Sequence, residues 1–160
     1  MPLPTVAYRL IGRFSTSRFA RTLHPILYRR AGGRGILGRA LGCEMILLTT
    51  TGRRTGRPRS VVLFAFPIAE PRGSRAVVAS RGGSKAVADW YLNLVASPSA
   101  SVQVHGRMAD RVRAREVSGD EYDTVFEVAA SGYPGYRLYR AESPVHVPIV
   151  VLEPAGSPAP

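Results

Sequence analysis

Between residues 44 and 152 the chain contains six short segments that are rich in apolar and β-branched residues. Each has four to ten residues, and most of the connections between them contain glycine or proline. Runs of this length and composition are typical of β-strands. Because they do not alternate regularly with helices, they favour a small antiparallel barrel over a Rossmann fold. The predicted strands are Glu44–Thr51, Ser60–Phe66, Arg75–Ser80, Ser101–Val104, Met108–Val117 and Val147–Leu152.

Helical patterns lie between these strands. One helix is predicted over Ala86–Leu94, and the S-x-x-E spacing of Ser118 and Glu121 predicts a capping box that opens a second. A short segment, Tyr133–Arg140, follows the second helix. We therefore expect a mainly β (α+β) fold, with about six antiparallel strands and two or three flanking helices.

The first 43 residues differ in composition from the rest. Over residues 5–30 apolar residues recur at helical spacing with arginines between them, and the pattern breaks near His24 and Pro25. Five glycines from Gly32 to Gly42 predict a flexible linker. We expect a basic amphipathic N-terminal segment with its linker (1–43), a barrel domain (44–154) and a disordered tail (155–160).

Composition fits one domain with one core, since 45% of the 160 residues are hydrophobic. The net charge is +11, and every basic side chain except Lys85 is an arginine. Eight of these arginines precede the first acidic residue, Glu44. Such a balance favours anionic partners, whether phosphates, nucleic acid or an anionic membrane surface, without choosing among them.

Cysteine and histidine usage narrows the chemistry. Cys43 is the only cysteine, which excludes an intrachain disulfide or a cysteine-based zinc site and suits a reducing cytosol. The three histidines and the acidic residues lack metal-ligand spacing, so we predict no metal site. We find neither a signal peptide nor the ~20 apolar residues of a membrane span, and we expect a cytoplasmic protein.

The turn after the first predicted strand is the richest candidate site. Thr49–Arg59 combines hydroxyls, glycines and four arginines in one connection between strands. Arginine forks bind phosphate oxygens in a bidentate manner, and turn amides form nests for anions. A solvated hairpin with surface arginines explains the composition equally well, so both interpretations stay open.

Three further segments are candidates. Ala79–Lys85 lies between a strand and a helix, where a helix N-terminus can meet an anion, but the phosphate-loop spacing is absent and an ordinary turn is the commoner explanation. Trp90 and Leu94 share one helical face, which core packing explains. Three tyrosines at intervals of three, beginning at Tyr133, suit either the wall of a pocket for a flat ring or a half-buried surface helix.

Taken in order, these blocks resemble the deazaflavin-dependent nitroreductase family, whose members are also described as F-420-dependent quinone reductases. The likeness runs from about Met45 to Pro154. It implies a split β-barrel that binds one deazaflavin, coenzyme F-420. The blocks are LLTTTGRRTGRPRS (Leu47–Ser60), VVASRGGS (Val77–Ser84), DWYLNLVASPSASVQV (Asp89–Val104), YPGYRLY (Tyr133–Tyr139) and PIVVLEP (Pro148–Pro154).

The resemblance also implies roles for individual residues. The arginine-rich turn would hold the phosphodiester and acidic tail of the coenzyme, and the tyrosines would line the acceptor side. Tyr133, followed by Ser80, is the expected hydrogen-bond donor to the acceptor. The implied coenzyme contacts are Arg53, Arg54, Arg57, Arg59, Ser80, Arg81, Gly82, Trp90 and Tyr91. The implied acceptor contacts are Phe64, Tyr133, Tyr136 and Tyr139.

Two departures from the family pattern matter. Arg54 and Arg81 stand where relatives often have lysine, which keeps the charge but alters the geometry. Phe64 stands where some relatives place a pocket tyrosine, and the missing hydroxyl leaves the acceptor preference open.

The implied reaction is hydride transfer from reduced F-420 to a quinone or a nitroaromatic acceptor. The alternatives are a non-catalytic module that binds the coenzyme or nucleic acid, and an FMN-binding reductase on the same barrel. We expect no nucleic-acid partner, because the aromatic residues are not interleaved with the basic runs. Residues 1–40 predict contact with an anionic membrane surface at the inner face of the cell membrane, with packing on the barrel as the alternative.

Overall fold

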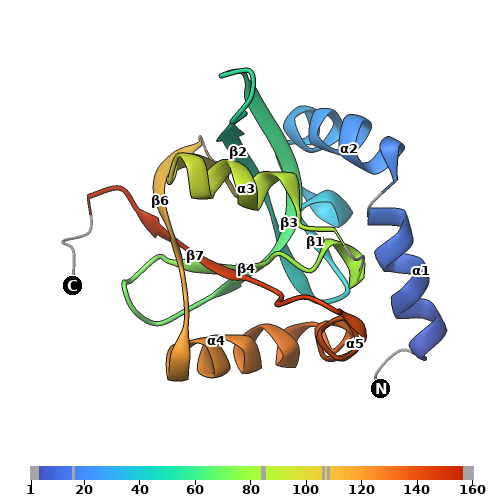
Figure 1. Cartoon of the computed structure of the whole chain (residues 1–160). Helices are drawn as coiled ribbons and strands as arrows, with labels where there is room; N and C mark the ends of the chain where they lie inside the picture. Colours follow the sequence, from blue (N-terminus) through green and yellow to red (C-terminus); the bar gives the residue numbers. More distant parts are fainter. Residues whose placement is uncertain (1–3, 16, 84–85, 106, 108, 157–160) are drawn as a thin grey trace.

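The computed structural model describes residues 4–15, 17–83, 86–105, 107 and 109–156. Its centre is an antiparallel β-barrel flanked by helices (Figure 1). The strands are β1 (Arg39–Ala40), β2 (Cys43–Thr51), β3 (Pro58–Pro67), β4 (Arg75–Val78), β5 (Ser99–Gln103), β6 (Asp110–Glu116) and β7 (Ile149–Pro154). The helices are α1 (Thr5–Ser15), α2 (Arg18–Ala31), α3 (Asp89–Ala96), α4 (Gly119–Gly132) and α5 (Gly135–Glu142), with short 3-10 turns η1 (Gly35–Leu37) and η2 (Arg81–Gly83).

Six strands close the barrel in the order β2-β3-β4-β7-β6-β5, and β5 pairs again with β2. Closure satisfies the strand edges that an open sheet would expose. The expected antiparallel split barrel is therefore confirmed. The seventh strand, β1, adds only two residues at the edge of β2.

The barrel is split between β3 and β4. These strands pair at only two positions, Phe66↔Ala76 and Pro67↔Arg75, whereas β3 pairs with β2 along eight. From Pro58 to Ala65 the edge of β3 that faces away from β2 is therefore free of any strand. An unpaired edge inside a domain needs other partners, and this opening becomes the site.

Alternation along β3 gives this strand two different faces. Residues directly opposite on β2 and β3 share a face, so Met45 lies with Phe64, whereas Ile46 lies with Leu63. The Ile46 face packs inside the barrel, and the Met45 face packs outside it against Tyr28 of α2. The Tyr28 hydroxyl donates a 2.8 Å hydrogen bond to the Met45 carbonyl and so fixes α2 on the barrel.

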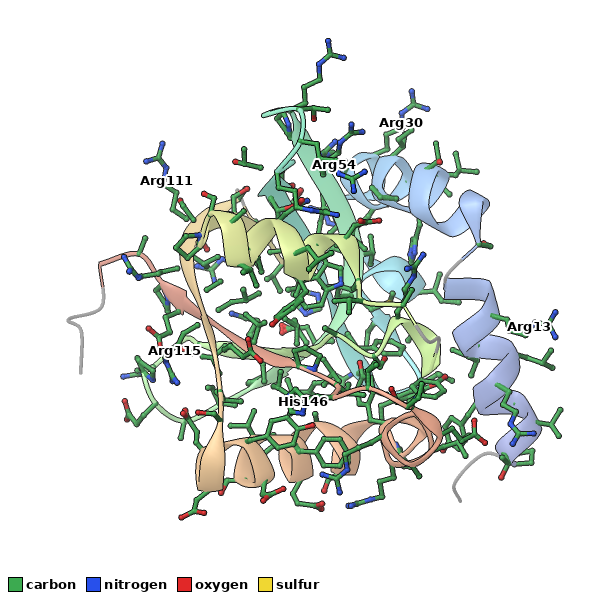
Figure 2. All side chains as sticks on the ribbon, viewed as in Figure 1. Arg13, Arg30, Arg54, Arg111, Arg115 and His146 are labelled. Atoms are coloured by element: carbon green, nitrogen blue, oxygen red, sulfur yellow. The ribbon has the colours of Figure 1, made fainter. Side chains whose placement is uncertain are left out.

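The N-terminal residues form two helices that pack on the barrel, and the break expected at His24 and Pro25 is wrong. The first helix ends at Ser15, and Pro25 is a buried residue inside α2. A proline in a helix interior costs about 3 kcal/mol or more through its lost hydrogen bond and its ring clash, and the packing of α2 around the fully buried Tyr28 offsets this cost. Arg13 and Arg30 project outward from α1 and α2 (Figure 2).

Two of the glycines expected to form a flexible linker, Gly33 and Gly38, are closely packed, whereas Gly35 and Gly42 face open space. Gly33 donates its N–H to the Tyr28 carbonyl (2.9 Å), and Met45 donates to the Gly38 carbonyl (2.9 Å). A Cβ on Gly33 would lie 2.5 Å from the Tyr28 hydroxyl oxygen. Glycine is therefore present here because the backbone approaches its neighbours closely.

The helix α4 begins directly after Ser118, as predicted, but the Ser118 side chain makes no capping bond. Glu121 does not complete a capping box and pairs with Arg115 at 2.8 Å. After β4 the chain forms η2, and α3 begins only at Asp89. Ser84 and Lys85, together with Met108 and the tail 157–160, lie outside the described residues.

Candidate active site

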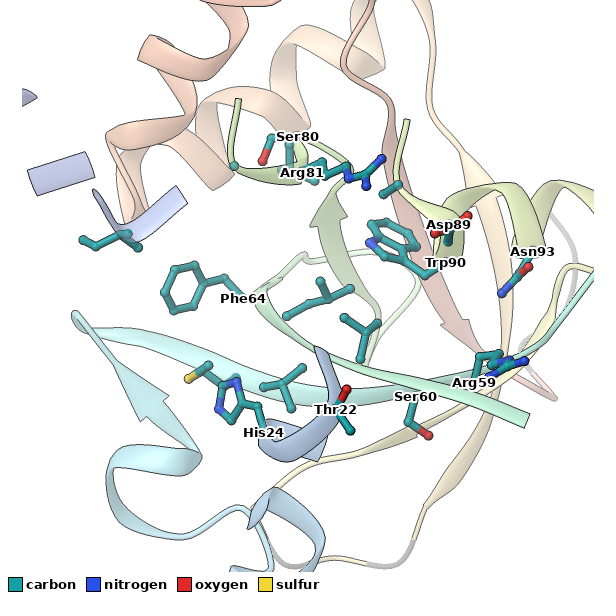
Figure 3. Close-up of a pocket in the computed structure, with 18 of the residues that line it drawn as sticks. Thr22, His24, Arg59, Ser60, Phe64, Ser80, Arg81, Asp89, Trp90 and Asn93 are labelled. Carbon is teal, nitrogen blue, oxygen red and sulfur yellow. The ribbon is translucent and has the colours of Figure 1, made fainter. Parts of the chain in front are cut away.

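A cavity of about 850 Å³ occupies the opening between β3 and β4. Every residue of β3 from Arg59 to Phe64 lines it, and α2, α3 and the segment after β4 supply the facing walls. Because the β3 edge is unpaired there, the cavity reaches both faces of this strand. Figure 3 shows β3 running between Trp90 and Asp89 on one side and Thr22 and His24 on the other.

We call the part on the barrel-interior face of β3 the inner lobe. Arg59 pairs with Thr50 across the β2–β3 ladder, and the Asn93 side chain donates to the Thr50 hydroxyl (3.0 Å). The helix α3 therefore covers this face. The inner-lobe residues are Arg59, Val61, Leu63, Ser80, Trp90 and Asn93.

We call the part on the opposite face of β3 the outer lobe. Arg29 of α2 donates to the Ser60 hydroxyl, so α2 covers this face. Apolar side chains supply most of its wall, and Thr22, His24 and Ser60 are the polar exceptions. The outer-lobe residues are Thr22, His24, Ile36, Ala40, Leu41, Met45, Ser60, Val62 and Phe64.

One end of the cavity is cationic. Arg53, Arg54 and Arg59 line it where the β2–β3 turn meets α3. The Arg53 amide donates to the Asn93 side-chain oxygen (3.1 Å), and its guanidinium reaches the same oxygen (3.4 Å) and Asp89 (3.3 Å). The turn is thus tied to α3 by a side chain that is only 4% exposed.

The loop after β4 forms the middle of the inner lobe. Ser80 is buried, and no hydrogen-bond partner for its hydroxyl occurs among the described residues. Gly82 has φ +62° and lies directly under Gly12 of α1. A Cβ on Gly12 would lie 2.5 Å from the Gly82 carbonyl oxygen, so α1 closes tightly over this loop.

Tyrosines form the end of the cavity remote from the arginines. The Tyr133 ring lies 5.1 Å from Phe64 and 5.1 Å from Tyr136, measured between centroids. The Tyr139 hydroxyl donates to the Tyr8 carbonyl, so in its 3.0 Å contact with Tyr133 it is Tyr133 that donates. Burial raises the pKa of all three tyrosines, which keeps the phenols protonated.

A family model described as F420H(2)-dependent quinone reductase matches residues 20–154, most of the chain. The chain belongs to this family. Its curated relatives include the F420H(2)-dependent quinone reductase Rv1261c of Mycobacterium tuberculosis, with 31% identity over 134 residues, 81% of this chain and 87% of the relative.

Solved structures agree with this membership. An F420-H2-dependent reductase, FDR-A, is 34% identical with a TM-score of 0.60, over 68% of this chain and 93% of that one. A structure described as a domain-swapped dimer is 30% identical with a TM-score of 0.63, over 80% of this chain and 92% of that one. As a member of the F420H(2)-dependent quinone reductase family, the protein is an oxidoreductase whose cofactor is reduced F-420.

The reductase gathers most of the predicted site residues around one cavity, with two exceptions. Arg57 is on the same turn but does not line the cavity. Tyr91 also lies outside it, because its hydroxyl donates to Glu116 (2.7 Å), and burial together with this carboxylate raises the pKa of Tyr91 to about 12. The residues that do line it are Arg53, Arg54, Arg59, Phe64, Ser80, Arg81, Gly82, Trp90, Tyr133, Tyr136 and Tyr139.

Sequence reasoning missed the contributions of the N-terminal helices and of Asn93. Ile11, Thr22 and His24 line the cavity although they precede the barrel domain by many residues. An amide in the otherwise apolar helix segment around Asn93 is the one signal that pointed to a buried polar role.

The described residues of the reductase contain no group of three His, Cys, Asp or Glu side chains that could hold a metal ion. Their helices include none with the length and apolar character needed to cross a membrane.

Proposed function

We propose that this reductase transfers hydride from reduced F-420 to a quinone, with the coenzyme in the inner lobe. The observation that carries the proposal is the joining of a cationic end to an apolar slot along the unpaired edge of β3. A deazaflavin with an acidic tail needs both surfaces, guanidinium groups for its anions and a flat apolar wall for its ring.

In this arrangement Arg53, Arg54 and Arg59 bind the anionic tail, and Trp90 borders the ring. Ser80 and Arg81 lie on the same side of β3 as Trp90 (Figure 3), and Gly82 lines the same cavity. The bound coenzyme supplies the hydride, and the chain supplies position and hydrogen bonds. Arg57 and Tyr91, which do not line the cavity, are left out of these contacts.

Ser80 is the stronger candidate for the donor to the acceptor oxygen. The Tyr133 proton is engaged by Tyr139, whereas the Ser80 hydroxyl has no partner among the described residues. A hydroxyl whose proton is not already engaged can donate a hydrogen bond to the negative charge that develops on a quinone oxygen. Tyr133, Tyr136 and Phe64 then form the wall against which the acceptor ring packs.

Oxidation of reduced F-420, followed by its absorbance, tests the proposal directly. We expect turnover with quinones, and a small panel of nitroaromatics tests the alternative acceptor class. No turnover with any quinone, or faster turnover with every nitroaromatic, would refute the quinone assignment.

Arg57, directly before β3, and Arg59, its second residue, give a matched pair for the coenzyme site. Arg59→Ala should weaken coenzyme binding about tenfold, because Arg59 lines the cavity, while Arg57→Ala on the same turn removes the same charge outside it. Fluorescence titration measures both. The Arg59 effect should shrink at high salt, since screening already weakens the wild type. Equal losses in the two variants would mean that only net charge matters.

Association with an anionic membrane surface is a second, separate proposal. It is supported by the outward face of α1, where Val6 and Leu10 are 65% and 61% exposed beside Arg9 and Arg13. Apolar side chains next to guanidinium groups suit the headgroup region of an anionic bilayer.

A further inference from the structure

The outer lobe has the character of a second binding compartment. Met45, Val62 and Phe64 form its floor on the sheet, and Ala40 and Leu41 continue the apolar wall. The inner lobe already offers the cationic end and the Trp90 wall that the proposed coenzyme position uses. The outer lobe therefore remains available to a different, mainly apolar ligand.

His24 is the titratable group of this lobe. It projects from α2 into the cavity near Thr22 and Phe64 (Figure 3), and its imidazole has no hydrogen-bond partner among the described residues. Burial lowers the pKa of His24, which favours the neutral ring at neutral pH. A neutral imidazole has one N–H donor for a carbonyl-type oxygen.

The mouth of the outer lobe is apolar and open to solvent. Ile36 is 81% exposed and Leu41 is 49% exposed, and both line the cavity. Large apolar side chains with this exposure at the rim of an apolar cavity mark a place where an apolar ligand leaves the protein. The two lobes meet over the unpaired edge of β3, so one ligand can reach the inner lobe and extend to this mouth.

We propose that the outer lobe binds an acceptor whose flat ring carries a long apolar substituent, with His24 donating a hydrogen bond to a ring oxygen and the substituent leaving past Ile36 and Leu41. This inference rests on the proposed function, because it places the acceptor of that reaction. In this inference α2 and η1 select acceptors that carry a long apolar substituent. Both elements lie outside the predicted barrel domain.

The first test alters the mouth. Ile36→Asp places a carboxylate at an exposed position, so the fold is retained, and Val95→Asp on α3 is the matched control at 64% exposure outside the cavity. The acceptors are menadione, which has a naphthoquinone ring without a tail, and a menaquinone analogue with an isoprenoid tail. Ile36→Asp should raise KM for the tailed quinone about tenfold and leave menadione unchanged, because only the tail would lie against the carboxylate and strip it of water.

The second test alters the polar contact. His24→Leu should lower kcat/KM about fivefold for both quinones, because both keep the ring oxygen, and His24→Gln should stay within twofold of the wild type because it retains a donor. Coenzyme affinity, measured by fluorescence, should be unchanged in every variant.

The outcomes separate this inference from the proposed function. Absence of turnover with both quinones in the wild type defeats the proposed function. Turnover in which Ile36→Asp changes neither acceptor, or changes both equally, defeats the outer-lobe assignment alone. A His24→Leu variant that loses coenzyme binding instead would place the coenzyme, and not the acceptor, beside His24.

Discussion

Asn93 is a polar side chain that is buried on an otherwise apolar helix, and both its amide nitrogen and its amide oxygen form hydrogen bonds. It donates to Thr50 and accepts from Arg53, so it joins α3 to the arginine-rich turn. Loss of one partner of a buried hydrogen bond costs roughly 1–3 kcal/mol, because the remaining group stays desolvated. Asn93→Ala should lower stability by about this amount and weaken coenzyme binding about fivefold.

A double-mutant cycle shows whether Asn93 acts through Arg53. In an Arg53→Ala background, Asn93→Ala should still lower stability but should no longer change coenzyme affinity. Denaturant unfolding and fluorescence titration supply the two readouts. Additive losses of affinity would instead mean that Asn93 contacts the coenzyme itself.

The donor to the acceptor is a second residue-scale question. Ser80→Ala should lower kcat about tenfold with coenzyme affinity unchanged, because it removes a hydroxyl with a free proton. Tyr133→Phe should lower kcat less than about threefold, because the Tyr133 proton is engaged by Tyr139. Steady-state kinetics at saturating coenzyme would give the opposite order if Tyr133 were the donor.

Residue types on short turns were the part of the site that could be predicted. Arg53, Arg59 and Ser80 lie at or within two residues of strand ends, so the strand pattern predicts where they emerge. The direction of the Arg57 side chain depends on the local geometry of the turn. The direction of Tyr91 depends on its hydrogen bond to Glu116, a contact that the sequence pattern does not predict. Their positions outside the cavity had to come from the structure.

At the scale of elements, α1 is held on the site by a contact between two glycines. Alanine normally stabilises a helix interior by about 1 kcal/mol relative to glycine. At Gly12 alanine should instead lower the stability, because a Cβ there would lie 2.5 Å from a backbone oxygen of η2 and 2.9 Å from the Tyr139 hydroxyl oxygen. Gly12→Ala should lower the melting temperature, and Leu10→Ala on the outward face of α1 should not do so to the same extent. A more stable Gly12→Ala variant would show that α1 is not closely seated.

The strands were predictable because side-chain alternation and turn residues act within a few residues. The N-terminal helices were not placed correctly, because their positions depend on long-range packing. Tyr28 bonds to Met45 from 17 residues away, and this contact keeps α2 helical through Pro25. Similarly, Glu121 bonds to Arg115 of β6 and not to the N-terminus of α4.

At the scale of the whole molecule, the net charge of +11 is spread over several surfaces and not confined to the site. Arg111 and Arg115 project from β6, far around the barrel from Arg13 and Arg30 (Figure 2). Bulk charge therefore attracts anions in general, and specificity for the coenzyme must come from the side chains that line the cavity. Because basic residues cover several surfaces, a test of membrane association must change exposed apolar side chains and not only the charge.

Membrane association should depend on the outward face of α1. The full chain should sediment with anionic vesicles at low salt and much less with neutral ones, because each basic residue near the surface contributes about 1 kcal/mol. Leu10→Asp should abolish most of this binding, whereas Val128→Asp, at an exposed apolar position of α4, should not. Deleting residues 1–43 is a poor test, because α1 and α2 wall the cavity and cover the barrel around the buried Tyr28. If the wild type stays in the supernatant with anionic vesicles at low salt, α1 serves only to close the site.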